Sequence, residues 1–147
     1  MDDRRREILL ARRQKDWDAY AHNEGAVMYR RSDGTPEPPT AEQAVVAQLL
    51  ELLAPEPQDS LLDAGCGAGE LTRHLRPHFG QVVATDLSAA MLERARQLLP
   101  GVPLHATPAH QLPFPDGSFS RALSYSVFFY FPDYPYVKQV FEEMLRV

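Results

Sequence analysis

The chain has 147 residues, of which 44% are hydrophobic and 24% are charged, and its formal net charge is −5. This length suggests one domain with a core of its own, and the acidic balance argues against a nucleic-acid-binding protein. Cys66 is the single cysteine, so an intrachain disulfide is excluded, and no run is apolar enough for a membrane span or a secretory signal. We therefore expect a cytoplasmic protein that binds neither nucleic acid nor membranes.

The first third of the chain is expected to be helical and polar. A helix is predicted over about 3–21, where nearby acidic residues largely balance the basic ones. We interpret the basic residues as a solvated helix face, and they are Arg4, Arg5, Arg6, Arg12, Arg13 and Lys15. Glycine and prolines predict a loop over 32–39. A capping-box pattern at Thr40 and Gln43 predicts the next helix, which the prolines at 55 and 57 end.

From residue 60 onward, short β-rich segments alternate with helices. Strands are predicted over 60–64, 81–85, 102–106 and 121–128, with helices over about 69–76, 88–99 and 133–147. Ser88 and Asp133 are the predicted N-caps of the last two helices. Such alternation implies a parallel sheet with right-handed crossovers. The expected fold is therefore α/β, a Rossmann-like doubly wound parallel sheet of about four strands with N-terminal helices, and ligands of such sheets bind at the carboxyl ends of the strands.

A glycine-rich turn follows the first predicted strand and reads Asp63-Ala64-Gly65-Cys66-Gly67-Ala68-Gly69. Glycines permit a tight turn and let backbone N–H groups approach a ligand closely. The N-terminus of the following helix favours an anionic group. Asp86 ends the next strand, 17 residues beyond Gly69, where a carboxylate can accept hydrogen bonds from two ribose hydroxyls. The pattern therefore indicates a nucleoside site.

The glycine spacing distinguishes two kinds of nucleoside site. A dinucleotide-binding turn needs glycine at position 70, but that residue is Glu70. The D-x-G-x-G-x-G pattern together with Asp86 instead resembles the class I S-adenosylmethionine-dependent methyltransferases, and more narrowly the small-molecule type often called type 11. The resemblance runs from about residue 40 to the end, with weaker similarity at 16–20. Dinucleotide binding and a purely structural turn are the less favoured alternatives.

The resemblance implies S-adenosyl-L-methionine as the cofactor and assigns residues to it. Gly65 and Gly67 would approach its methionine part, with Asp63 positioning that part through the loop, and Asp86 would take the ribose. Leu87 and Met91 would lie near the adenine, the backbone around Ala109 would face the adenine edge, and Ser126 would lie near the cofactor at the end of the fourth strand. The implied cofactor-binding set is Asp63, Gly65, Cys66, Gly67, Gly69, Asp86, Leu87, Met91, Ala109 and Ser126, although Cys66 is predicted to be a small loop-filling residue rather than a nucleophile.

Two positions depart from the family pattern. Pro108 stands where the family usually has an acidic residue that accepts the adenine amino group, and Ser120 stands where it has an aspartate. We expect both departures to affect the affinity for the cofactor. They leave its identity unchanged.

The implied reaction is methyl transfer to a small-molecule acceptor by direct in-line displacement, without a metal. Positioning can supply most of the rate of such a reaction, and no catalytic residue is identified. Conceivable general bases are Tyr20, His22, His110 and Tyr130. The aromatic residues at 128–131 and 134 could wall a substrate pocket or simply pack in the core and at its rim. The alternative function is a non-catalytic S-adenosylmethionine-binding or interaction remnant.

The predicted organisation is a helical and loop cap segment over 1–39 followed by a cofactor-binding core over 40–147. The family's sheet has seven strands in the order 3-2-1-4-5-7-6, and this sequence supplies the first four, in the order 3-2-1-4, before it stops ahead of a fifth. The fourth strand would then be an exposed apolar edge, and such edges recruit partners. We therefore expect possible self-association through that strand.

Overall fold

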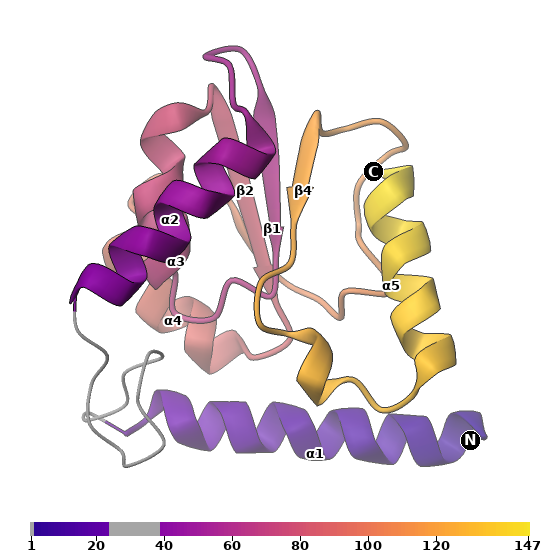
Figure 1. Cartoon of the computed structure of the whole chain (residues 1–147). Coiled ribbons are helices and arrows are strands. Elements are labelled where there is room, and N and C mark those ends of the chain that lie inside the picture. Colours follow the sequence, from indigo (N-terminus) through magenta and orange to yellow (C-terminus); the bar gives the residue numbers. More distant parts are fainter. Residues whose placement is uncertain (1, 24–38) are drawn as a thin grey trace.

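The computed structural model describes residues 2–23 and 39–147. Its centre is a parallel sheet of four strands in the order β3-β2-β1-β4, with helices packed around it (Figure 1). The strands are β1 (Ser60–Ala64), β2 (Gln81–Asp86), β3 (Leu104–Ala106) and β4 (Arg121–Leu123). The predicted α/β class and strand order are confirmed.

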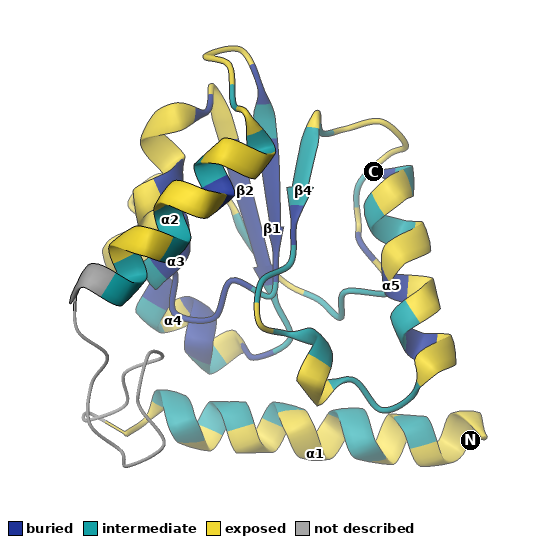
Figure 2. Ribbon diagram, in the orientation of Figure 1, coloured by how far each residue is buried: buried dark blue, intermediate teal, exposed yellow. Residues whose placement is uncertain are grey.

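The sheet buries apolar side chains on both of its faces because residues of a strand alternate in direction. In β1, Leu61 belongs to one buried cluster and its neighbour Leu62 to another. The cluster around Leu61 includes residues of α2 (Pro39–Leu53) and α3 (Glu70–Leu75) and Phe79, which follows the 3₁₀ helix η1 (Arg76–His78), and α4 (Ala89–Leu98) packs beside α3. The cluster around Leu62 includes Met144 of α5 (Tyr134–Arg146). Helices therefore cover both faces, as a doubly wound sheet requires (Figure 2).

The predicted helix caps are largely confirmed. The Ser88 hydroxyl accepts a hydrogen bond from the N–H of Met91, and the Asp133 carboxylate accepts one from the N–H of Tyr136. Each side chain thus satisfies a backbone donor that the helix itself leaves unpaired. The helix predicted from Thr40 begins at Pro39 and ends at Leu53. The predicted cap at Thr40 depends on a side chain that the structure does not describe. Residues 32–38 of the predicted loop also lie outside the described residues.

The predicted extents of the third and fourth strands were wrong. The third strand begins at Leu104, two residues later than predicted, and β4 ends at Leu123 instead of residue 128. Beyond β4 the backbone turns at Ser126, whose φ is +59°, and the 3₁₀ helix η2 (Phe128–Tyr130) follows. The aromatic run after Leu123 has high β-propensity, but here its side chains contact other aromatic rings and border a cavity.

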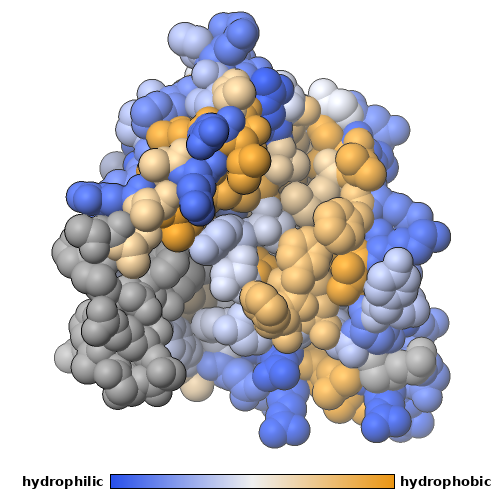
Figure 3. Space-filling view, viewed as in Figure 1, coloured by the Kyte–Doolittle hydropathy of each residue, from blue (hydrophilic) through white to orange (hydrophobic). Residues whose placement is uncertain are grey.

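The spacing of Val137, Val140, Phe141, Met144 and Leu145 predicts a single apolar stripe that packs on the sheet, and this prediction was wrong in part. Val140 is buried and Met144 packs in the cluster around Leu62, but Phe141 and Leu145 are exposed. The buried positions of α5 are instead Tyr136 and Val140, with Val147 following the helix. Figure 3 shows apolar surface from β4 toward η2 and α5, the two elements that carry the exposed side chains of Phe129, Phe141 and Leu145.

The N-terminal helix α1 (Asp3–Ala21) lies across the carboxyl ends of the strands (Figure 1). None of its residues is buried, and one side of the helix is half-buried (Figure 2). A helix was predicted over these residues, but the prediction that its basic residues form a solvated face was wrong for Arg6, which is largely buried and pairs with Asp133 at 3.2 Å. Arg13 is exposed as predicted and also borders a cavity. In the described part of the chain, no helix has the length and apolarity to cross a membrane.

Candidate functional site

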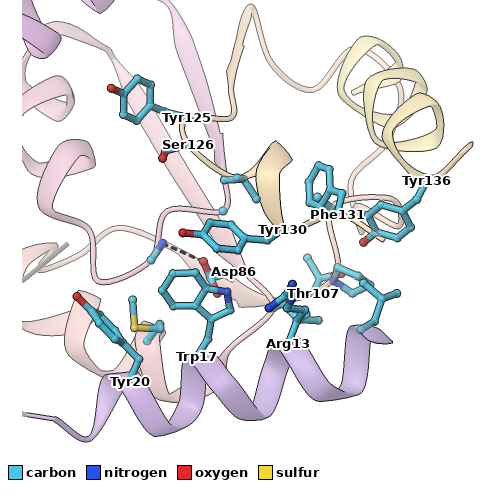
Figure 4. A pocket seen from close by; sticks show the side chains of 18 residues that line it. Arg13, Trp17, Tyr20, Asp86, Thr107, Tyr125, Ser126, Tyr130, Phe131 and Tyr136 are labelled. Atoms are coloured by element: carbon cyan, nitrogen blue, oxygen red, sulfur yellow. Dashed lines mark hydrogen bonds between the residues drawn. The ribbon is translucent and has the colours of Figure 1, made fainter. Parts of the chain in front are cut away.

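A cavity of about 410 Å³ lies between the carboxyl ends of the strands and α1. This volume falls within the range of small-molecule and cofactor sites. Its wall is formed by Leu10, Arg13, Trp17, Tyr20, Gly65, Gly67, Asp86, Leu87, Met91, Thr107, Pro108, Ala109, Tyr125, Ser126, Val127, Tyr130, Phe131 and Tyr136 (Figure 4). Seven of the ten residues predicted to bind a cofactor are among them, namely Gly65, Gly67, Asp86, Leu87, Met91, Ala109 and Ser126.

The glycine turn forms one side of this cavity and needs its glycines. Gly65, Gly67 and Gly69 have φ values of +89°, +57° and +84°, in the left-handed region that other residues rarely adopt. A Cβ at Gly65 would lie 2.6 Å from Cγ2 of Val127, which is also a wall residue. The N–H groups of Gly65 and Cys66 both donate to the carbonyl of Thr85, at 2.7 and 2.9 Å, and so tie the turn to β2.

Asp86 stands at the end of β2 and faces the turn. Its Oδ2 accepts from the Gly67 N–H (Figure 4), and its Oδ1 accepts from the Ser88 N–H, both at 2.9 Å. Burial raises the pKa of this carboxyl, although the N–H donors of Ser88, Gly67 and Leu87 oppose the shift. Each carboxylate oxygen has more than one acceptor position. Asp86 can therefore hold the turn in place and still accept from ligand hydroxyls in the cavity.

Asp63 lies below the turn and does not border the cavity. It is buried, and its Oδ2 accepts a hydrogen bond of 2.6 Å from the hydroxyl of Thr72 in α3. Burial raises the pKa of Asp63 to about 6, against the effect of the Thr72 hydrogen bond, and the charge of Asp86 adds to the rise. This arrangement fastens the end of β1 to α3. The side chain of Asp63 is thus placed to support the turn from beneath.

Cys66 and Gly69 are also outside the cavity wall. Burial raises the pKa of the Cys66 thiol well above its ordinary value, and the sulfur lies 3.5 Å from the carbonyl oxygen of Gly67. A thiol that stays protonated is a poor nucleophile. A Cβ at Gly69 would lie 2.8 Å from Cδ1 of Leu99. These two residues therefore serve the close packing between the turn and α4.

One face of α1 forms the opposite side of the cavity, and from this face the sequence prediction had named only Tyr20, as a conceivable general base. Leu10, Arg13, Trp17 and Tyr20 recur at intervals of three or four residues, and all four border the cavity. The Trp17 ring packs edge-on against the rings of Tyr20 and Tyr130, with centroid distances of 5.5 and 5.0 Å. The helical spacing of Leu10, Trp17 and Tyr20 within an otherwise charged helix was the signal that could have identified this face.

Polar contacts hold α1 at both ends of the cavity. Toward its C-terminus, the Asp18 carboxylate accepts a short hydrogen bond from the Ser88 hydroxyl at the start of α4. Toward its N-terminus, Arg6 pairs with Asp133 at the start of α5, and both side chains are largely buried. The helix is thus attached to the elements that follow β2 and β4.

The candidate general bases differ in their access to the cavity. Tyr20 and Tyr130 border it, whereas His22 and His110 do not. Nδ1 of His110 lies 3.0 Å from the hydroxyl of Tyr136, a wall residue, and burial lowers the pKa of His110, as does the charge of Arg6. Of the aromatic residues that could form a pocket wall, Tyr130 and Phe131 do so, while Phe129 and Tyr134 are exposed.

The two departures from the family pattern lie in different places. Pro108 borders the cavity next to Ala109, in agreement with its expected position. Ser120 lies at the amino end of the sheet, where its N–H donates to the Ser60 hydroxyl and its own hydroxyl donates to Asp59 at 2.8 Å. Since the cavity is at the carboxyl end, the expectation that Ser120 affects cofactor affinity has no structural basis.

The fold and the cavity together define an α/β domain with a nucleoside-type site at a glycine turn. The sequence profile of the family described as "Methyltransferase domain" matches residues 62–147. The chain belongs to this family. Its fold is that of the class I methyltransferases, whose cofactor is S-adenosylmethionine.

Individual relatives agree with this assignment. The chain is 39% identical over 84 residues to the "uncharacterized methyltransferase YodH" of Bacillus subtilis, in a match that covers 54% of the chain and 36% of that protein. It is 34% identical over 109 residues to trans-aconitate 2-methyltransferase of Deinococcus radiodurans, covering 72% of the chain and 41% of the relative. The chain therefore spans less than half the length of these curated relatives.

A solved structure shows the same fold. N-methyltransferase NodS of Bradyrhizobium japonicum, in complex with S-adenosyl-L-homocysteine, superposes with a TM-score of 0.71 over 89% of the chain and 65% of NodS, at 23% identity. The relatives are named for different acceptors, from trans-aconitate to a uracil of 23S rRNA. The comparisons therefore establish the family and the fold and leave the acceptor open.

The residues at the cavity fit the family's cofactor. Gly65 and Gly67 border it with backbone in the left-handed region and no Cβ, which allows close approach of a ligand. Asp86 presents a carboxylate to the same space, and Leu87 and Met91 supply apolar surface beside it. A nucleoside with a polar ribose, an apolar base face and a charged amino-acid end matches this set of groups.

Proposed function

We propose that the chain binds S-adenosylmethionine in the cavity and supports transfer of its methyl group to a small-molecule acceptor. The observation that carries the proposal is the juxtaposition of the Gly65–Gly67 turn with Asp86, joined by the 2.9 Å hydrogen bond from the Gly67 N–H to Oδ2. The bound cofactor would supply a methyl group already activated by a sulfonium. The remaining task of the protein is to bind both molecules and orient them.

We assign the cofactor to the residues predicted for it. Asp86 would accept from the ribose hydroxyls, and Leu87, Met91 and the backbone at Ala109 would hold the adenine. Gly65, Gly67 and Ser126 would face the methionine part, with Asp63, Cys66 and Gly69 acting through the shape of the turn. The roles of ribose, adenine and methionine contacts are those that the family resemblance implies, and the support for the direct contacts is that seven of these residues border the cavity.

We further propose that residues 1–39 act as a cap over the core formed by residues 40–147. The support is that α1 supplies four wall residues and is held at both ends by Asp18 and Arg6. A cap of this kind excludes water from the cavity, and water exclusion strengthens electrostatic interactions inside it. A cavity closed by a helix on one side also suits a small acceptor better than a base within a folded RNA.

Calorimetric titration of the chain with S-adenosylhomocysteine and, separately, with NAD tests the proposed site. We expect binding of S-adenosylhomocysteine and none of NAD, because residue 70 is glutamate and not the glycine of a dinucleotide turn. Binding of NAD alone would refute the proposal. Binding of S-adenosylhomocysteine without methyl transfer to any member of a panel of small acceptors would favour a non-catalytic cofactor-binding chain.

A further inference from the structure

We infer that Arg13 recognises an oxyanion, a carboxylate or a phosphate, on the methyl acceptor, and that the acceptor has an apolar or aromatic body. This inference rests on the proposed function and names the substrate class of the same cavity. It starts from the wall residues to which the proposed function assigns no part of the cofactor, and these come from α1, from the segment after β4 and from the start of α5.

Arg13 is the one cation among the described residues of the wall. It lies on the α1 face one turn before Trp17, and Figure 4 shows its side chain extending toward the cavity beside Thr107. Its side chain is 49% exposed and forms an ion pair of 3.7 Å with the exposed carboxylate of Asp16, which is too long for a hydrogen bond and leaves its N–H donors available. The guanidinium is therefore placed to meet a ligand, and its planar donors match the geometry of carboxylate and phosphate groups.

The only acidic residue among the described wall residues is Asp86, and its two oxygens are already bonded to the N–H groups of Gly67 and Ser88. In the proposed site, Asp86 also serves the ribose. Inside the cavity no other carboxylate faces Arg13, since its ion-pair partner Asp16 lies outside the wall and is itself 55% exposed. An anionic ligand would meet Arg13 on the cavity side, and its charge would also be attracted by the sulfonium of the cofactor.

The surfaces around Arg13 are aromatic. Phe131 and Tyr136 border the cavity on the side of α5, with ring centroids 5.1 Å apart in an edge-on arrangement. Trp17 and Tyr130 form a second edge-on pair. Aromatic walls favour an apolar or aromatic body, while the hydroxyls of Thr107 and Tyr136 provide a few polar groups that can fix its orientation.

Titration of the chain saturated with S-adenosylhomocysteine tests the inference, with benzoate, phenyl phosphate and neutral benzamide as probes and nuclear magnetic resonance as the readout. We expect benzoate or phenyl phosphate to bind at least about tenfold more tightly than benzamide, since hydrogen bonds between charged groups are the strong ones. Arg13→Met should abolish the preference and Arg13→Lys should retain part of it. Arg12→Met is the matched control, because it removes the same charge from an exposed neighbour outside the wall.

Three results would overturn the inference. Equal binding of benzamide and the anions would do so, as would an Arg13→Met variant that keeps the preference. A loss of S-adenosylhomocysteine affinity in Arg13→Met as large as the loss of benzoate affinity would assign Arg13 to the cofactor, and would leave the proposed function intact. A parent chain that binds no S-adenosylhomocysteine would instead refute the proposed function, and this inference with it.

Discussion

Asp86 combines a structural and a binding task in one carboxylate. It joins the glycine turn to the start of α4 through the N–H groups of Gly67 and Ser88. The same oxygens face the cavity, so a ligand hydroxyl would add to an arrangement that already exists in the free protein. Preorganisation of this kind reduces the cost of ordering the site on binding.

We predict that Asp86→Ala weakens binding of S-adenosylhomocysteine by about 1–3 kcal/mol, the range for loss of a charged hydrogen-bonding partner. Glu93→Ala is a control, because this acid is exposed on α4 away from the cavity wall. Calorimetry of both variants measures the difference. If Asp86→Ala binds as tightly as the parent, the ribose is not held at Asp86 and the assignment of the site fails.

The raised pKa of Asp63 makes the stability of the chain depend on pH. Its pKa of about 6 in the folded chain lies above the ordinary value of 3.8. Between pH 3.8 and pH 6, Asp63 is therefore mostly protonated in the folded state and mostly ionised in the unfolded state. The stabilisation by this group is fully present below pH 3.8 and is lost as the pH rises through 6. Near neutral pH, the buried charge therefore lowers the free energy of unfolding.

We expect Asp63→Asn to remove this penalty while its amide oxygen still accepts from Thr72. The variant should be more stable than the parent at pH 7 by on the order of 2–3 kcal/mol, and the two should converge near pH 4. Urea unfolding of both chains at several pH values measures this difference. A difference that stays constant from pH 4 to pH 7 would show that Asp63 does not titrate in this interval.

Helix α1 is held to the rest of the fold by few buried contacts. It has no buried residue, and its attachment depends on aromatic contacts and two polar links at Ser88 and Asp133. Elements with few buried contacts open at lower free energy than core strands. The cap is therefore suited to let ligands in and out while the sheet stays folded.

We predict that Asp18→Ala accelerates amide hydrogen exchange along α1 and leaves β1 and β2 unchanged. The reason is the loss of the Ser88 hydroxyl as a partner that ties the helix to α4. Glu7→Ala is the matched control, since it removes an exposed acid from the same helix. Exchange followed by mass spectrometry should distinguish the two variants. Equal rates in both would mean that this link does not hold the cap.

Features set by local sequence were predicted correctly, whereas features set by contacts between distant segments were not. The turn with Gly65 and Gly67, and Asp86 after the next strand, were predicted correctly because local backbone requirements and spacing define them. The place of Trp17 in the cavity wall was not predicted, because it depends on the packing of α1 across the sheet. Tertiary contacts also shortened β4, where the β-favouring sequence after Leu123 turns instead to form the cavity wall.

The open edge of the sheet at β4 is the basis of the predicted self-association. In the described structure, β4 pairs with β1 on one side, at Leu61, Leu62 and Asp63, and with no strand on the other. Exposed apolar side chains at Phe129, Phe141 and Leu145 lie on the elements beside this edge (Figure 3). An open edge next to apolar surface is a template for a second copy, although β4 is shorter than predicted and offers few backbone groups.

We therefore expect the purified chain to self-associate as its concentration rises, and sedimentation velocity over a range of concentrations measures this. Leu145→Glu should shift the chain toward monomer, because it places a charge on the exposed apolar surface. Leu52→Glu is the control, since Leu52 is 80% exposed on α2, which packs on the opposite face of the sheet from α5. A parent chain that stays monomeric at every concentration would show that the open edge of β4 does not recruit a second copy. Equal effects of the two substitutions would show that association depends on general surface apolarity and does not involve this edge.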